Sequence, residues 1–303
     1  MLKVRLLGRC ALESESTIQH DLSCAKAREL LGYLACHRNR DLPREVVIGT
    51  LWGDMQEEQG KRALRQTLWQ LQSALGPFQI TASRPLIEAD GEWLRLNPDS
   101  GIWLDVEKFE GLEKLTRLHK GEPVPEDHFK NLREGVALYR GHLLEDCYRD
   151  WCVAQRSELR RKYLNMLSRL MFQQRKRNDF DGAMATALRL LEEERASEQA
   201  HGMIMVLHYR EGDRTSALRQ FQHYKLIMRE EFNVPPAKAL VDLYKKIGEE
   251  LGLDTNDQPG PDIKEGGSFE ERMIAILEDI RQEIALNRED ISELKRSIDR
   301  KKL

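Results

Sequence analysis

The chain has 303 residues, of which 33% are charged, and its formal net charge is −3. This length suffices for two domains with cores of their own and a tail. No apolar run approaches the roughly 18–20 residues of a membrane span, and no signal-peptide pattern opens the chain, so we expect a cytoplasmic protein with no membrane partner. Because the near-neutral charge gives no overall attraction to nucleic acid, the role of a basic residue depends on its placement.

The first 52 residues predict two strands and two short helices. Apolar and polar residues alternate over residues 3–7 and, less regularly, over 17–22, as is typical of strands. Leu30, Leu31 and Leu34 share one face of a helix over residues 25–36. A second helix is expected over residues 43–52, because proline is tolerated in the first turn.

A third, longer helix carries the most informative pattern. Its apolar stripe consists of Leu64, Leu68, Leu71 and Leu75, and Gly76-Pro77 is expected to end it. The opposite face is polar and partly basic, so its side chains can reach phosphates or base edges in a DNA major groove. The candidate DNA-binding residues are Lys61, Arg62, Arg65, Gln66, Thr67, Trp69 and Gln70.

These candidates have different expected roles. Lys61, Arg62 and Arg65 are placed at the start of the helix, where the helix dipole also favours phosphate oxygens. Gln66 and Gln70 are expected to read bases, because a glutamine amide can bind adenine with two hydrogen bonds. Trp69 either packs on a sugar or a thymine methyl group, or completes the edge of the core.

A hairpin is predicted after the third helix. Residues 86–89 and 92–96 flank Asp90-Gly91, which is a strong turn signal. Strands, three helices and a closing hairpin together predict a winged helix-turn-helix over residues 1–98. Asp90 and Gly91 are then the tip of the wing, which we expect to approach the neighbouring minor groove.

From about residue 102 onward the apolar spacing is helical and repeats every 34 residues, the tetratricopeptide (TPR) period. Asn178-Asp179 is followed by Ala183, and Gly212-Asp213 is followed by Ala217 at the same spacing. Small residues suit close approach of paired helices, so we predict a short TPR-like α-solenoid over residues 102–251. The expected fold is therefore mainly α, with small β-sheets confined to the winged helix.

A linker and a coiled-coil helix are predicted at the end of the chain. Residues 252–267 are rich in Gly, Pro, Asp and Asn, whereas residues 268–303 show heptad spacing with a single polar Asn in the seam. The seam residues expected to mediate oligomerisation are Leu277, Ile280, Ile284, Asn287, Ile291, Leu294 and Ile298. A narrow apolar stripe favours pairing with a second copy as a homodimer, and the alternative is that the helix folds back onto the solenoid.

Several segments carry a family resemblance. AKARELLGYLACHRNRDLPREVVIGTLWGD, LRQTLWQLQSALG and GEWLRLNP resemble the effector domain of OmpR/PhoB-type regulators and, more closely, the DNA-binding half of SARP-type bacterial activators. DVEKF at 105–109 and the later GVALYRGHLLEDCYRDWCVAQRSELRRKYL resemble the bacterial transcriptional activator domain of that family. The resemblance covers roughly residues 2–251. It implies a sequence-specific activator that binds direct promoter repeats in double-stranded DNA and contacts RNA polymerase.

The chain departs from this family in two places. Trp69-Gln70 stands where related helices place adjacent basic residues, and the tail beyond residue 267 is not part of the usual short activator. An alternative function is therefore a protein-interaction adaptor that works through the solenoid and coiled coil, with a winged helix that no longer binds DNA.

No sequence pattern indicates an enzyme. The phosphate-binding GxxxxGK[ST], the dinucleotide-binding GxGxxG, the nucleophile motif GxSxG and the zinc motif HExxH do not occur. The histidines are scattered, and the five cysteines lack CxxC spacing, so they are expected to be reduced thiols. We expect no catalytic residues, no metal and no cofactor.

Overall fold

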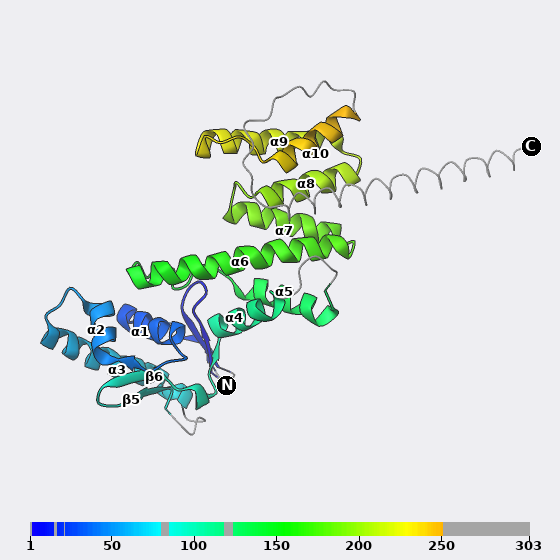
Figure 1. Ribbon diagram of the computed structural model, residues 1–303. Helices are drawn as coiled ribbons and strands as arrows, with labels where there is room; N and C mark the ends of the chain where they lie inside the picture. Colours follow the sequence, from blue (N-terminus) through cyan, green and yellow to red (C-terminus); the bar gives the residue numbers. More distant parts are fainter. Residues whose placement is uncertain (1, 15–16, 21, 80–84, 118–123, 251–303) are drawn as a thin grey trace, which may run out of the picture. The chain divides into compact units, whose positions relative to one another are not determined.

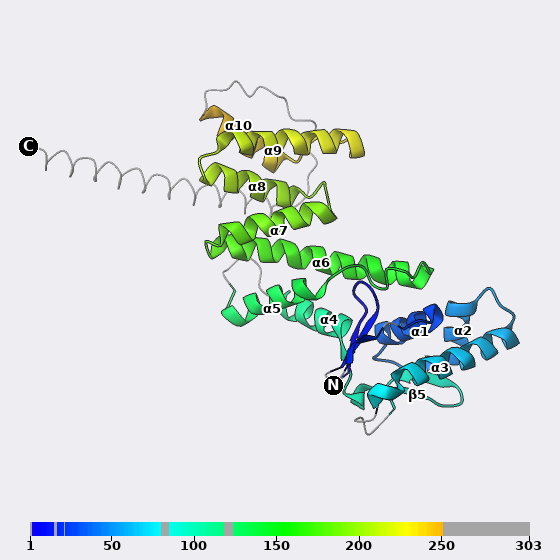
Figure 2. The ribbon, with the colours of Figure 1, turned by 180° about the vertical axis from the view of Figure 1, so that it is seen from behind.

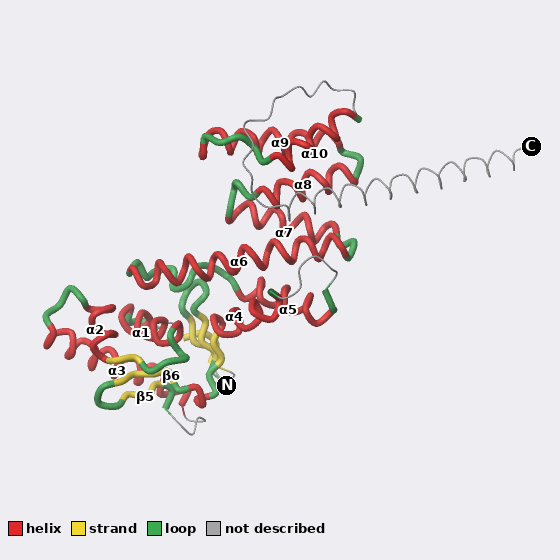
Figure 3. Tube along the Cα trace, viewed as in Figure 1, coloured by secondary structure: helices red, strands yellow, loops and turns green. Residues whose placement is uncertain are grey.

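The computed structural model describes residues 2–14, 17–20, 22–79, 85–117 and 124–250. Its described part is mainly helical, and the strands lie in the N-terminal region (Figure 3), as predicted. The chain divides into two compact units, Met1–Met166 and Leu167–Leu303. The predicted linker (252–267) and coiled-coil helix (268–303) lie outside the described residues.

A four-stranded sheet opens the first unit. Its strands are β1 (Lys3–Arg5), β2 (Ala11–Ser14), β3 (Thr17–His20) and β7 (Trp103–Leu104), in the order β3-β2-β1-β7. Only the β1–β7 pair is parallel. The strand predicted over residues 3–7 ends at Arg5, because the amides of Leu6 and Leu7 donate to the carboxylate of Asp105.

Three helices form the expected helix-turn-helix core (Figure 1). They are α1 (Ala25–Cys36), α2 (Arg44–Trp52), preceded by the short strand β4 (Leu42–Pro43), and α3 (Glu57–Gln79). The leucine stripe of α3 is buried, with every member at most 6% exposed. The prediction that Gly76-Pro77 ends α3 is wrong. Gly76 does not adopt the left-handed conformation of a helix C-cap, and Pro77 lies in the last turn, where little helix remains to be interrupted.

The predicted hairpin is confirmed. Strands β5 (Ile87–Ala89) and β6 (Trp93–Leu96) are antiparallel, and β4 pairs with the other side of β6, which gives a three-stranded sheet in the order β4-β6-β5. The turn is closed by the carboxylate of Asp90, which accepts the amides of Glu92 at 3.2 Å and Trp93 at 2.8 Å. The winged-helix architecture is therefore complete in the first unit.

The same unit contains the first helices that follow the wing. After a 3₁₀ turn, η1 (Pro98–Ser100), come α4 (Asp105–Thr116) and α5 (Glu126–Leu138), which pack side by side (Figures 1 and 2). Helix α6 (Asp150–Lys176) begins in this unit, where Tyr163 stacks on Tyr139 with ring centroids 4.1 Å apart. The amide of Leu144 donates to the carbonyl of Leu6 at 2.9 Å, so the chain after α5 returns to the N-terminal sheet.

The second unit is a stack of helices, as expected for a solenoid. It contains α7 (Phe180–Glu193), α8 (Glu198–Arg210), α9 (Arg214–Ile227), the π-helical turn η2 (Met228–Phe232) and α10 (Lys238–Glu249). Successive helices lie next to one another in both ribbon views (Figures 1 and 2). Met205, Phe221, Tyr224 and Leu240 belong to its buried core. Helix α10 begins at Lys238, two residues after Pro235-Pro236.

The 34-residue repeat predicted from sequence has the same geometry in both copies. Asn178 and Gly212 adopt left-handed φ angles of 60° and 81°. The next residue in each copy is an aspartate that caps a helix: Asp179 accepts the amide of Gly182, and Asp213 that of Ser216. Ala183 and Ala217 are fully buried one turn later. Each repeat is therefore a helix, a tight left-handed turn and a second helix.

Candidate nucleic-acid interface

Helix α3 presents part of its predicted binding face to solvent. Arg62, Arg65 and Gln66 are exposed, and Trp69 is 68% exposed. Their spacing of three and four residues places them on one side of the helix, opposite the buried leucine stripe. Within the described ranges neither Arg62 nor Arg65 forms an ion pair. The exposed indole excludes the alternative in which Trp69 completes the edge of the core, because such a side chain would be buried. Its contact with a sugar or a thymine methyl group stays a prediction.

Lys61 is less available than the sequence suggested. Helix α3 begins at Glu57, one turn earlier than expected, so Lys61 is not at the helix N-terminus. Its ammonium lies 2.5 Å from a carboxylate oxygen of Glu57 and 3.2 Å from one of Glu58. The hydrogen bonds that Lys61 donates to these carboxylates raise its pKa. The first turn of the helix is therefore acidic, and Lys61 offsets part of its negative charge.

Two other candidates point toward the protein. Thr67 is only 4% exposed, and its hydroxyl donates to the carbonyl of Ala63 at 2.8 Å. Gln70 is half-buried, and its amide oxygen accepts from the thiol of Cys24 at 3.1 Å. The structure does not bring these two side chains to the exposed face. On the helical wheel, Thr67 lies beside Leu71 and Leu64 of the buried stripe.

The turn of the wing is fixed to helix α2. The backbone amide of Arg44 donates to the carbonyl of Glu92 at 2.8 Å, and its guanidinium donates to the carbonyl of Asp90 at 3.0 Å. Arg44 is not among the residues predicted from the sequence. A basic residue directly after Pro43, at a predicted helix start, could have indicated it. Asp90 and Gly91 lie at the tip as expected, but the carboxylates of Asp90 and Glu92 make the tip acidic.

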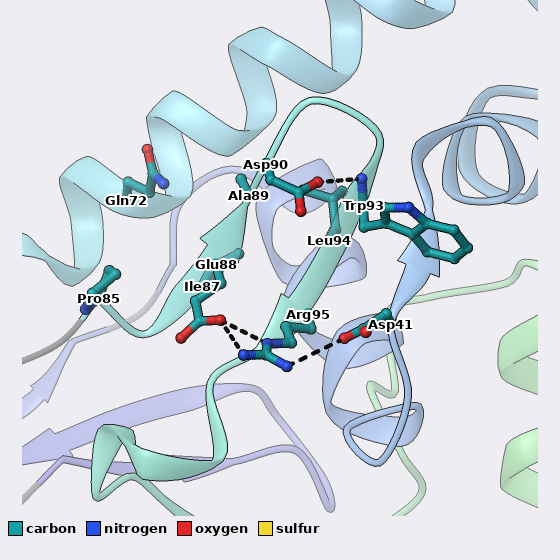
Figure 4. A pocket seen from close by; sticks show the side chains of 10 residues that line it. All are labelled: Asp41, Gln72, Pro85, Ile87, Glu88, Ala89, Asp90, Trp93, Leu94 and Arg95. Carbon is teal, nitrogen blue, oxygen red and sulfur yellow. Dashed lines mark hydrogen bonds and ion pairs between the residues drawn. The ribbon is translucent and has the colours of Figure 1, made fainter.

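Two hollows adjoin this region. One, of about 430 Å³, lies between α2, α3 and the turn, and its lining includes Arg44, Lys61, Arg65 and Trp93. The other, of about 660 Å³, lies along the hairpin (Figure 4). There the guanidinium of Arg95 lies 2.6 Å from a carboxylate oxygen of Glu88 and 3.6 Å from one of Asp41.

Other kinds of site receive no support from the described residues. No group of three or more His, Cys, Asp or Glu side chains in them could hold a metal ion. All five cysteines are described, and none of them forms a disulfide. No described helix is long and apolar enough to cross a membrane.

Comparison with known families identifies the helices that follow the wing. Residues 104–248 match the family model of the bacterial transcriptional activator domain. We call this matched segment the activator domain. It begins at the end of β7 and ends within α10, so it includes the helix pair of the first unit and the repeats of the second. Together with the winged helix in front of it, the activator domain confirms the resemblance to SARP-type bacterial transcriptional activators.

A solved structure shares this fold. Mycobacterium tuberculosis EmbR, determined in complex with a low-affinity phosphopeptide, matches with a TM-score of 0.69 and 19% sequence identity. The match covers 84% of this chain and 66% of the EmbR chain, which is just under two thirds of its length. At this identity the likeness concerns the fold. Comparison with curated proteins gave no match. The match to the activator domain supports a transcription regulator.

Proposed function

We propose that this regulator binds double-stranded DNA in a sequence-specific manner through α3 and activates transcription. The observation that carries the proposal is the exposed face of α3. There, two arginines without ion pairs in the described structure, Arg62 and Arg65, adjoin Gln66 and the exposed Trp69. This face belongs to the third helix of a winged helix, which is the element that such folds place in a major groove.

The side chains on this face differ in chemistry and so in proposed role. Arg62 and Arg65 bind phosphates, which sets affinity but carries no sequence information. Gln66 reads a base edge through its amide, and Trp69 packs on a sugar or a thymine methyl group. Lys61 and Gln70 take part only if DNA displaces their present partners, Glu57 and Cys24.

The wing supports this arrangement through Arg44. The two hydrogen bonds of Arg44 hold the turn against α2, so wing and recognition helix approach DNA as one rigid surface. Gly91, which has no side chain, is the part of the tip best suited to enter a minor groove. The carboxylates of Asp90 and Glu92 oppose that approach.

Selection of bound duplexes from a random pool, with full-length protein, tests the proposal. An enriched motif with two evenly spaced copies is the expected result. Gln66→Ala should reduce the free-energy difference between the preferred base and the other bases at one position by about 1–3 kcal/mol. Arg62→Ala should weaken binding to all sequences alike and should reduce the slope of log affinity against log salt concentration by about one unit. Gln222→Ala and Arg133→Ala replace exposed residues of the same types outside α3 and should change neither quantity.

The remaining partners follow from the activator domain. The family implies contact with RNA polymerase at promoter repeats, and the heptad pattern of residues 268–303 supports a homodimer. A protein with these partners acts in the cytoplasm. Removal of the tail should abolish the paired spacing of the selected motif while a single copy is retained.

A second function, that of an adaptor without DNA contact, is favoured by the acidic first turn of α3 and the acidic wing tip. Salt dependence separates the two functions. Phosphate contacts release counterions, so the logarithm of the affinity of a DNA-binding protein falls linearly with the logarithm of salt concentration. The adaptor should show no enriched motif and little duplex binding even at low salt.

A further inference from the structure

The hairpin has an open edge that the proposed DNA contact does not use. The 660 Å³ hollow runs along this edge and is lined by residues that include Gln72, Ile87, Glu88, Ala89, Trp93 and Arg95 (Figure 4). In the three-stranded sheet β4-β6-β5, strand β5 is at the edge, and among the described residues it pairs with β6 alone.

The backbone of β5 offers unused hydrogen-bonding groups on that edge. The amide of Asp90 donates to the carbonyl of Trp93, and the amide of Asn97 donates to the carbonyl of Leu86. These two hydrogen bonds lie on either side of the Glu88–Arg95 pair. In an antiparallel ladder, residues whose backbone faces the partner alternate with residues whose backbone faces away. The N–H and C=O groups of Ile87 and Ala89 therefore point away from β6, where an added strand would bind.

The outer face of the same sheet is acidic and aromatic. Three carboxylates, those of Asp41, Glu88 and Asp90, line the hollow together with one guanidinium, that of Arg95, which pairs with Glu88 and Asp41, so negative charge is in excess. Trp93 is 43% exposed on this face, two residues before Arg95, whereas Leu94 between them is fully buried. Carboxylates repel phosphates and acidic peptides, but they attract lysine or arginine, which an indole ring also attracts.

We propose that the β5 edge binds an extended segment of a partner protein in which lysine or arginine alternates with apolar residues. The segment adds a fourth strand next to β5, as in other complexes formed by strand addition. Side chains alternate between the two faces of a strand, so the basic residues lie beside Glu88 on the outer face and the apolar residues lie on the side of α3. This site is separate from the exposed face of α3 and does not depend on DNA binding.

A synthetic peptide and two substitutions at one position test the proposal. The probe is a fluorescent peptide of about ten residues that alternates lysine with valine, and binding to the full-length protein is read by anisotropy. Ala89→Pro removes the outward N–H without removing a bond to β6, and the matched control Ala89→Val retains that N–H. We expect Ala89→Pro to weaken binding about tenfold and Ala89→Val to leave it within about twofold.

Charge is tested in parallel. Glu88→Gln should weaken peptide binding. The control Glu230→Gln, at an exposed position of the second unit, should not weaken it. A peptide with glutamate in place of lysine should not bind. Unchanged thermal unfolding shows that each variant is folded.

Three results would overturn the proposal. They are equal binding to the proline and valine variants, equal binding of the glutamate peptide, and no binding of the lysine peptide. A lower oligomeric mass of Ala89→Pro in sedimentation would also overturn it, because the edge would then be occupied by a second copy of this chain.

Discussion

The carboxylate of Asp105 joins the start of α4 to the end of β1. It accepts the amides of Leu6, Leu7 and Val106 at 2.7–2.9 Å and is 1% exposed. Burial raises the pKa of Asp105 to about 6, although the three amides oppose this. The folded protein therefore binds a proton at Asp105 at pH values where the unfolded chain, whose pKa is 3.8, has lost it.

Asp105→Asn isolates this effect. Between pH 4.5 and 7.5 the Asp105 contribution to the free energy of unfolding of wild type should fall by about 2 kcal/mol, because stability is lost as pH rises through a raised folded pKa. The variant should lack this component. All five tryptophans lie in the first unit, so urea unfolding followed by their fluorescence reports on that unit. Parallel pH profiles for the two proteins would contradict the prediction.

Glu92 tests whether the wing tip lies near DNA. It is exposed, and only its backbone carbonyl binds Arg44, so Glu92→Gln removes a charge without removing that hydrogen bond. If the tip approaches a minor groove, the variant should bind duplex DNA about two- to fivefold more tightly at low salt, with the gain lost as salt is added. Glu230→Gln, in the second unit, is the control and should change nothing. Equal affinity of Glu92→Gln and wild type would place the tip away from the phosphates.

The two left-handed turns of the solenoid differ in one residue, and this difference allows a matched test at the level of the element. Gly212 adopts φ 81° with no side chain to strain, whereas Asn178 occupies the equivalent position at φ 60°. Gly212→Ala should lower the free energy of unfolding of the second unit by about 1 kcal/mol, and Asn178→Gly should not lower it. Circular dichroism measures the change, and tryptophan fluorescence should not follow it. Equal losses in both variants would mean that the turns are not strained by a Cβ.

At the scale of the molecule, a cluster of charges joins the winged helix to the activator domain within the first unit. Arg38, just after α1, donates to Glu110 of α4 at 2.9 Å, and Lys162 of α6 donates to the same carboxylate at 2.7 Å. Burial raises the pKa of Glu110, but the hydrogen bonds from Lys162 and Arg38 outweigh burial, and the net pKa is lowered.

Removal of one partner should therefore destabilise the whole unit. Arg38→Ala should cost about 1–3 kcal/mol, because it leaves a largely buried carboxylate with a single cation. Arg161→Ala breaks an exposed pair with Glu158, which solvent screens, and should cost much less than Arg38→Ala. Tryptophan fluorescence during urea unfolding measures both variants, and equal effects would show that the cluster does not stabilise the junction.

We expect the predicted coiled coil to assemble the molecule. Full-length protein should sediment as a dimer, whereas a chain that ends at residue 250 should sediment as a monomer. Asn287→Leu should raise the stability of the assembly but loosen its preference for two copies, because a single polar seam residue selects register and partner number. A monomeric full-length protein would favour the alternative in which the tail folds back onto the solenoid.

The sequence by itself determined the elements whose signals are local. A leucine stripe at helical spacing predicted α3, Asp90-Gly91 predicted the hairpin, and the 34-residue repeat predicted the helix pairs of the solenoid, because side-chain period and turn chemistry act over a few residues. Short strands such as β2 and β7 escaped prediction, since two to four residues carry no periodicity and are stabilised by partners distant in the chain.

Only the tertiary structure decided which polar residues of α3 are available to a partner. The sequence predicted Thr67 and Gln70 as DNA-binding residues, but contacts with Ala63 and Cys24 hold them against the protein. Trp69, for which a position at the edge of the core was the alternative prediction, is exposed. The residue type determines which groups a side chain is able to bind. Its burial and its partners in the folded protein determine whether it is available to bind them.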